Sequence, residues 1–146
     1  MRSVIQRVKK ASVEVESRVV GRIGQGLLVL VGIGQGDTVR DIDWMVDKIV
    51  NLRIFENEEG KFDRSLLDID GELLAVSQFT LYGDCSRGRR PSFSDAMEAG
   101  AARELFEAFV QKAREKVRRV ETGVFQAMMD VALVNDGPVT LIIDSK

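Results

Sequence analysis

The sequence predicts an α+β protein with a mainly antiparallel, barrel-like β-sheet and two long helices. Short apolar or alternating runs, separated by turn residues, recur along most of the chain and are typical of strands. Two longer segments instead repeat apolar residues at the spacing of a helix. Because no repeat, linker or low-complexity segment interrupts the 146 residues, we expect a single domain over residues 1–146.

The N-terminal part of the chain predicts strands at residues 4–8, 12–16, 19–23 and 27–33. The second strand alternates polar and apolar residues and should form a hairpin with the third. The fourth is apolar on both faces and should be a buried central strand. The glycines around it lack the spacing of a phosphate-binding loop or a dinucleotide fingerprint, so we interpret them as turns.

The first helix should begin after Thr38, where Asp41 completes the pattern of a capping box. Three aspartates near this start could suggest a metal site, but the helix dipole explains them better. A second helix is expected over residues 95–117, with Ser94 as its cap and basic residues at its end.

Further strands are predicted in the remaining segments. A strand is expected at residues 52–55 and hairpins are expected for 66–69 with 73–76 and for 127–134 with 139–143. The second hairpin would turn at Asn135-Asp136-Gly137-Pro138, because proline cannot continue a central strand ladder and glycine accepts unusual backbone angles. On composition alone this turn ends a strand and does nothing more.

Composition excludes several kinds of chemistry. The chain has no histidine and one cysteine, which removes Ser-His-Asp and Cys-His catalysis and histidine- or cysteine-rich metal sites. No motif in the sequence is typical of a metal-binding or cofactor-binding site. The single cysteine, together with the absence of a signal peptide or a membrane-spanning run, predicts a cytoplasmic protein. With a net charge of −2, nucleic acid could bind only through a local basic patch.

Two segments in the middle of the chain are candidates for function. Ser77-Gln78-Phe79-Thr80 places polar side chains at the end of a buried strand, where each needs a hydrogen-bond partner. The following loop, residues 82–93, carries Arg87, Arg89 and Arg90 between two aromatic residues. Such a loop is either a solvated charged loop or a contact for RNA phosphates and exposed bases, and the residues alone favour neither.

Ser77-Gln78-Phe79-Thr80 and Asn135-Asp136-Gly137-Pro138-Val139-Thr140 together resemble the two signature motifs of the D-aminoacyl-tRNA deacylases. The segments at residues 5–8, 11–13, 26–30 and 90–94 are similar to the same family, so the resemblance covers essentially the whole chain.

The resemblance implies a cytoplasmic homodimer that hydrolyses the ester between a D-amino acid, or glycine mischarged on alanine tRNA, and the 3′-terminal adenosine of tRNA. Gly137-Pro138 would be a cis unit that reaches into the partner's active site and leaves no room for an L side chain. Ser77, Gln78, Phe79 and Thr80 would line the adenosine and ester end of the site. Phe125 and Met129 would wall the adenine pocket.

The mechanism is open between two hypotheses. Thr80 could be a nucleophile, but a threonine hydroxyl needs an adjacent base and the chain offers no histidine. We favour a mechanism in which the substrate's ribose hydroxyl activates water, backbone N–H groups near Phe79 and Thr80 stabilise the oxyanion, and Thr80 positions the ester.

Three other functions remain as alternatives. The chain could be a non-catalytic RNA-binding module that uses the arginine loop, an esterase for small free esters, or a structural homodimer in which Gly137-Pro138 is only a turn. The RNA-binding module explains the arginine loop but neither the polar end of the buried strand nor the Gly-Pro turn, and dependence of hydrolysis on the tRNA moiety would argue against the esterase.

Overall fold

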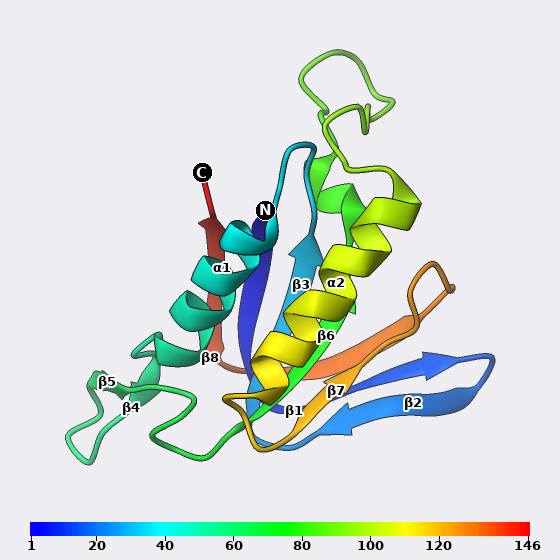
Figure 1. Cartoon of the computed structure of the whole chain (residues 1–146). Helices are drawn as coiled ribbons and strands as arrows, with labels where there is room; N and C mark the ends of the chain where they lie inside the picture. The colour runs from blue at the N-terminus through cyan, green and yellow to red at the C-terminus, as the bar shows by residue number, and fades with distance from the viewer.

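The computed structural model describes all residues from 1 to 146 and is organised around one mixed β-sheet (Figure 1). The elements in chain order are β1 (Arg2–Val15), β2 (Arg18–Ile23), β3 (Gly26–Gly32), α1 (Val39–Asn51), β4 (Phe55–Glu56), β5 (Phe62–Arg64), β6 (Glu72–Ser77), the short 3-10 helix η1 (Phe79–Tyr82), α2 (Ala99–Arg114), β7 (Val120–Thr122) and β8 (Asp130–Asp144).

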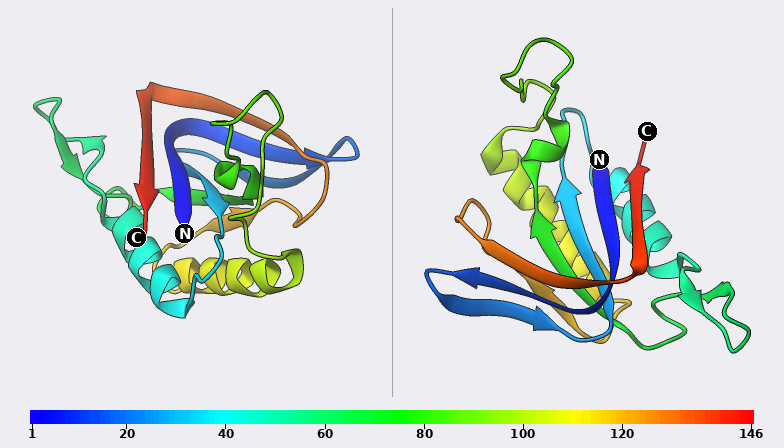
Figure 2. Two further views of the ribbon diagram at one scale, coloured as in Figure 1. Left: turned by 90° about the horizontal axis from the view of Figure 1, so that it is seen from above. Right: turned by 180° about the vertical axis from the view of Figure 1, so that it is seen from behind.

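β1 is the strand on which the sheet is built. It pairs antiparallel with β3 along its first half, with β2 along its second half, and with β8 along nearly its whole length. β6 joins β3, and β7 joins β6, in parallel. The two views of Figure 2 show β1 and β8 bending together, so that the sheet curls toward a barrel. The predicted fold class is confirmed, although one side of the sheet is parallel.

Three predicted strand arrangements are wrong. Residues 4–8 and 12–15 belong to one continuous strand, β1, and Glu16 lies in the turn that follows it. Residues 66–69 form a turn rather than a hairpin arm, because β6 finds its partners in β3 and β7. The segment around Gly137-Pro138 is not a hairpin turn either, since residues on both sides of it pair with β1. Local sequence patterns identify strands but cannot choose their partners.

Both helices form close to the predicted places. The predicted start of α1 is confirmed, because the N–H of Thr38 donates to the Asp41 carboxylate at 2.8 Å. The prediction that Ser94 caps the second helix is wrong. Glu98 caps α2 by accepting from the N–H groups of Gly100 and Ala101 at 2.9 and 3.2 Å, which holds the pKa of Glu98 below its ordinary value. Neither helix is long and apolar enough to cross a membrane.

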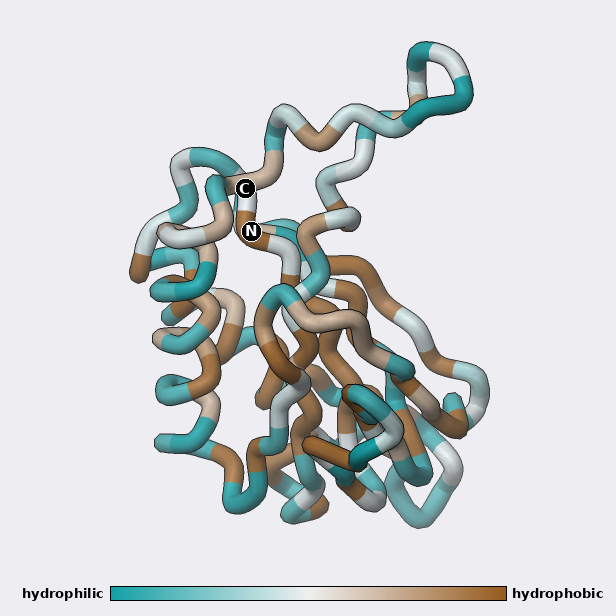
Figure 3. Tube along the Cα trace, turned by 90° about the vertical axis from the view of Figure 1, so that its right-hand side faces the viewer, coloured by the Kyte–Doolittle hydropathy of each residue, from teal (hydrophilic) through white to brown (hydrophobic).

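The core lies on both sides of β3 and β6, as the continuous apolar run of β3 predicts. Leu27, Val29 and Val31 face the helices, where they join the larger core cluster with residues such as Ile49 of α1. Leu28 faces the opposite side, in a smaller cluster that also contains residues of β1, β2 and β6. Figure 3 shows the hydrophobic positions concentrated in the body of the sheet and hydrophilic residues at the tips of the loops.

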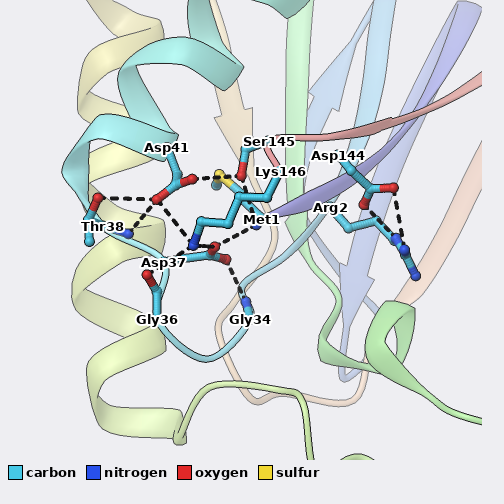
Figure 4. Close-up of polar contacts among 10 residues, drawn as sticks. All are labelled: Met1, Arg2, Gly34, Gly36, Asp37, Thr38, Asp41, Asp144, Ser145 and Lys146. Atoms are coloured by element: carbon cyan, nitrogen blue, oxygen red, sulfur yellow. Dashed lines mark hydrogen bonds and ion pairs between the residues drawn. The ribbon is translucent and has the colours of Figure 1, made fainter.

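A polar cluster joins the start of α1 to both ends of the described chain (Figure 4). Asp37 accepts from the Met1 ammonium at 2.6 Å and from Lys146 at 3.1 Å. Asp41 accepts from the Ser145 hydroxyl at 2.8 Å. Burial alone would raise the pKa of Asp41, but hydrogen bonds to its carboxylate outweigh burial and hold that pKa below its ordinary value. These aspartates are thus occupied by capping and ion pairing.

Candidate functional site

A cavity of about 750 Å³ opens between the ends of β3 and β6, the start of α2, and the segment that joins β7 to β8. Twelve of its 16 lining residues are hydrophobic, and none carries an ionisable side chain. The lining is formed by Val31, Ile33, Val76, Ser77, Gln78, Phe79, Thr80, Met97, Ala99, Ala102, Phe125, Gln126, Ala127, Met128, Met129 and Val131.

The structure brings the four residues from 77 to 80 together with Phe125 and Met129 in this one cavity. Ser77 is the last residue of β6, and Gln78 follows it with its N–H donating to Val31 of β3 at 2.8 Å. Phe79 and Thr80 do not continue the strand, because the chain turns there into η1. This turn exposes both residues at the mouth of the cavity.

The hydrogen bonds around Thr80 limit what its hydroxyl can do. Gln78 Nε2 donates to Thr80 Oγ1, so the nearest polar neighbour of the hydroxyl is an amide, which is not a base. The backbone N–H groups of Phe79 and Thr80 donate to no acceptor within the chain. The cavity therefore offers two free N–H donors beside a hydroxyl but no general base of its own.

Phe125 and Met129 form the opposite wall of the cavity, and α2 packs against Phe125. The ring of Phe125 packs against Phe106 of α2, with centroids 6.0 Å apart, and the guanidinium of Arg103 lies 5.2 Å from the Phe125 centroid. Met129 lies against Gly123, where an added Cβ would come within 2.5 Å of its sulfur. This wall is thus a packed apolar surface, to which α2 contributes an aromatic ring and a cation.

Arg87, Arg89 and Arg90 lie outside the cavity, on the loop that projects beyond η1 (Figures 1 and 3). All three are exposed, and none forms a hydrogen bond or an ion pair within the chain. The base of the loop is closed by two backbone hydrogen bonds between Asp84 and Ser92, at 2.8 and 2.9 Å. The arginines are therefore carried on a tethered loop next to the cavity mouth.

Gly137 and Pro138 are not part of the same cavity. Their peptide bond is cis, as expected, and both residues are exposed on β8. Gly137 has a φ of 128° and lines a separate, polar cavity of about 540 Å³. Within one chain the structure therefore keeps this unit apart from Ser77–Thr80.

Two residues hold the Gly-Pro unit: Arg7, to which the sequence assigned no role, and Asn135 of the second signature motif. Arg7 of β1 is 5% exposed, and it donates to the carbonyl oxygens of Asp136 at 3.0 Å and Ile54 at 2.7 Å. Asn135 accepts from the N–H of Val139 at 3.0 Å and so spans the unit. The sequence did contain one indication of this role. Arg7 lies two residues after Ile5 in β1, so both side chains point to the buried face of the sheet, where a charged residue is unusual.

Comparisons with known proteins show the family and the fold of the chain. The family model described as D-Tyr-tRNA(Tyr) deacylase matches residues 4–144. A D-aminoacyl-tRNA deacylase of Desulfitobacterium hafniense (strain DSM 10664 / DCB-2) is 64% identical over 100% of this chain and 98% of its own length, and one of Aquifex aeolicus (strain VF5) is 60% identical over 100% and 99%.

Two solved structures have the same fold. That of a c-Myc DNA unwinding element binding protein has a TM-score of 0.95 at 41% identity and covers 100% of this chain and 99% of its own. That of a probable eukaryotic D-amino acid tRNA deacylase has a TM-score of 0.82 at 18% identity, over 97% of each chain, and supports the fold alone. The chain belongs to the D-Tyr-tRNA(Tyr) deacylase family.

Proposed function

We propose that this protein hydrolyses the ester bond of D-aminoacyl-tRNA, releasing a free D-amino acid and tRNA. One observation carries the proposal: the first signature segment and the Phe125–Met129 wall meet in a single apolar cavity that has free N–H donors at its mouth. The cavity has the size of a small-molecule site, and its apolar wall suits the flat face of an adenine. The 3′-terminal adenosine would fill the cavity, with the ester at Phe79 and Thr80.

The lining of the cavity favours a reaction assisted by the substrate. Water attacks the ester carbonyl carbon, the bond to the 3′-oxygen breaks, and the 3′-oxygen takes up a proton. Since no lining side chain is ionisable, the neighbouring 2′-hydroxyl of the ribose would orient the water and shuttle the proton. The N–H groups of Phe79 and Thr80 would stabilise the oxyanion, and the Thr80 hydroxyl would position the ester.

The chiral filter would be Gly137-Pro138 of a second copy in a homodimer. This proposal is supported by the separation of the two motifs within one chain and by the exposure of the Gly-Pro unit. Main-chain carbonyls that contact the substrate's α-amino group would sense its configuration without sensing the identity of the side chain. Glycine has no side chain on either face and would pass this filter, so glycyl-tRNA would also be hydrolysed.

The arginine loop would contact the tRNA itself. Arg87, Arg89 and Arg90 have no acidic partner in the chain, and a guanidinium binds phosphate oxygens in a bidentate way. Because these contacts would be electrostatic and independent of sequence, tRNA binding should weaken as the salt concentration rises.

Comparing the hydrolysis of D-Tyr-tRNA, L-Tyr-tRNA and a small D-tyrosyl ester tests the proposed function. We expect rapid release from D-Tyr-tRNA alone. A binding module would release nothing from any of the three, whereas an esterase would cleave the small ester as fast as the tRNA. Gly137→Ala should lower the discrimination between D and L substrates. If only stability changed, the unit would be a structural turn.

The role of Thr80 can be tested separately. We expect Thr80→Ala to retain part of the activity, because the free N–H groups belong to the backbone. A D-Tyr-tRNA ending in 2′-deoxyadenosine should be hydrolysed poorly by the unaltered protein. Complete loss of turnover in Thr80→Ala with intact substrate binding would favour a nucleophile, and full activity on the deoxy substrate would contradict assistance by the ribose.

A further inference from the structure

An exposed pair of aromatic rings stands at the mouth of the cavity. Phe79 of η1 is 58% exposed and Phe93 is 36% exposed. Their centroids are 5.1 Å apart at an interplanar angle of 66°, which is an edge-to-face contact. In this geometry part of each ring's surface is not covered by the other ring. Phe79 itself lines the cavity. We call Phe79 and Phe93 the aromatic pair.

Phe93 is held in place although it follows an exposed loop. On its N-terminal side, Ser92 is paired with Asp84 in a two-hydrogen-bond bridge. On its C-terminal side, Gln35 receives the chain: its N–H donates to the Asp95 carbonyl at 2.9 Å and its side-chain amide donates to the Ser94 carbonyl at 2.6 Å. The ring of Phe93 is therefore carried by the hydrogen-bonded base of the loop and not by its projecting part.

Positive charge lies close to the aromatic pair along the chain. The loop between Asp84 and Ser92 carries Arg87, Arg89 and Arg90, all exposed and without an acidic partner in the chain. Phe79 lines the apolar cavity, Phe93 contacts its ring, and the loop that carries the three arginines projects beyond η1, which contains Phe79 (Figure 1). This order matches a single-stranded nucleic acid end, in which each base lies beside a phosphate.

We propose that the aromatic pair is a stacking subsite for the nucleotide that precedes the terminal adenosine of the tRNA 3′ end. The inference rests on the proposed function, which places the adenosine in the cavity. Because Phe79 lines the cavity and Phe93 contacts its ring, the path we propose for the single-stranded end runs past both rings, where an unstacked base can stack on an aromatic face. The loop arginines bind the phosphates on either side of that base.

Affinity measurements with substrate analogues of two lengths test the subsite. The probes are D-tyrosyl-3′-aminoadenosine, whose amide resists hydrolysis, and the same analogue extended at its 5′ side by two cytidines. The readout is the gain in affinity from the short to the long analogue, measured for the unaltered chain, Phe93→Leu, Phe93→Trp and Trp44→Ala. Trp44 is the matched control, because it is an exposed aromatic on α1 that does not line the cavity.

In the unaltered chain we expect the long analogue to bind about 5- to 150-fold more tightly than the short one, as for one stacked base. Phe93→Leu should abolish most of this gain, Phe93→Trp should keep it, and Trp44→Ala should leave it as it is. Binding of both analogues without any gain, or a gain that survives in Phe93→Leu, overturns the subsite while leaving the deacylase proposal standing. An equal loss for both analogues in Phe93→Leu also overturns it, because Phe93 would then only support the cavity. A chain that binds neither analogue refutes the proposed function and the subsite with it.

Discussion

Replacing Arg7 tests how the Gly-Pro unit is held. The guanidinium of Arg7 is almost completely buried and donates to two carbonyl oxygens from distant parts of the chain, at Asp136 and Ile54. It also lies 5.4 Å from the centroid of Phe62 in the β4–β5 hairpin. A lysine keeps the charge but presents a single ammonium, which cannot reach both carbonyls in the same way.

The size of the effect follows from these contacts. A hydrogen bond from a charged donor contributes about 1.5–3 kcal/mol, so Arg7→Lys, which loses one of the two, should lower the free energy of unfolding by about that amount. Arg7→Ala loses both hydrogen bonds and leaves the two carbonyls without their donors, which at the same value for each bond should cost about 3–6 kcal/mol. Arg2→Lys is the matched control on the same strand, because the Arg2–Asp144 pair is 41% exposed on both sides and should change stability by less than about 1 kcal/mol.

Urea unfolding measures the stability, and hydrolysis of D- and L-Tyr-tRNA measures selectivity. Release of the Asp136 carbonyl would let Gly137-Pro138 shift, and a displacement of about 1 Å at a site can reduce a rate by up to about 100-fold. We therefore expect Arg7→Lys to lower the ratio of D to L hydrolysis by about 10- to 100-fold. An Arg7→Lys protein with unaltered stability and an unaltered D-to-L ratio would refute this account of how the unit is held.

Three further predictions concern the scaffold. Gly26→Ala should destabilise the protein by about 3 kcal/mol or more in urea unfolding, because the added Cβ would overlap the Glu72 backbone, whereas at Gly24 the nearest atom is 3.8 Å away and the same change should be nearly neutral. The pKa of Asp41 is lowered in the folded state. The Asp41 carboxylate therefore stabilises the protein above the ordinary pKa of 3.8, and this contribution is lost as the pH falls below 3.8. Asp41→Asn should accordingly reduce the loss of stability at acid pH, measured as the free energy of unfolding against pH. Burial, and then the charge of Asp37, raise the pKa of Tyr82 to about 12. Because Tyr82 is the single tyrosine, tyrosinate absorbance should titrate near pH 12, and the free energy of unfolding should fall as the pH rises above 10.0. An absorbance midpoint near pH 10.0 would contradict the burial of Tyr82.

Much of the secondary structure could be predicted because its causes are local. The cap of α1 depends on two residues three positions apart, and the apolar run of β3 reports burial on both faces whatever its neighbours are. The cap of α2 could not be predicted, because Ser94 and Glu98 are both capable caps. Residues 95–97 instead pair with a distant segment, because the Gln35 N–H donates to the Asp95 carbonyl and the Met97 N–H donates to the Ile33 carbonyl, so the helix begins only after Glu98.

The candidate site also combines features that local sequence predicts with features that depend on the tertiary structure. The two signature segments are continuous stretches, so the sequence predicts Ser77–Thr80 and Gly137-Pro138 as site residues without a structure. Only the tertiary structure could place Phe79 on a turn beside Phe93, bring Phe125 across from β6, and leave Gly137-Pro138 on another face. The burial of Arg7 was also decided there, because its two acceptors lie 47 and 129 residues away along the chain. Backbone preferences and side-chain periodicity depend on neighbouring residues, so the sequence determines them. Strand partners, cavities and buried charges depend on contacts between distant segments, which local sequence patterns do not predict.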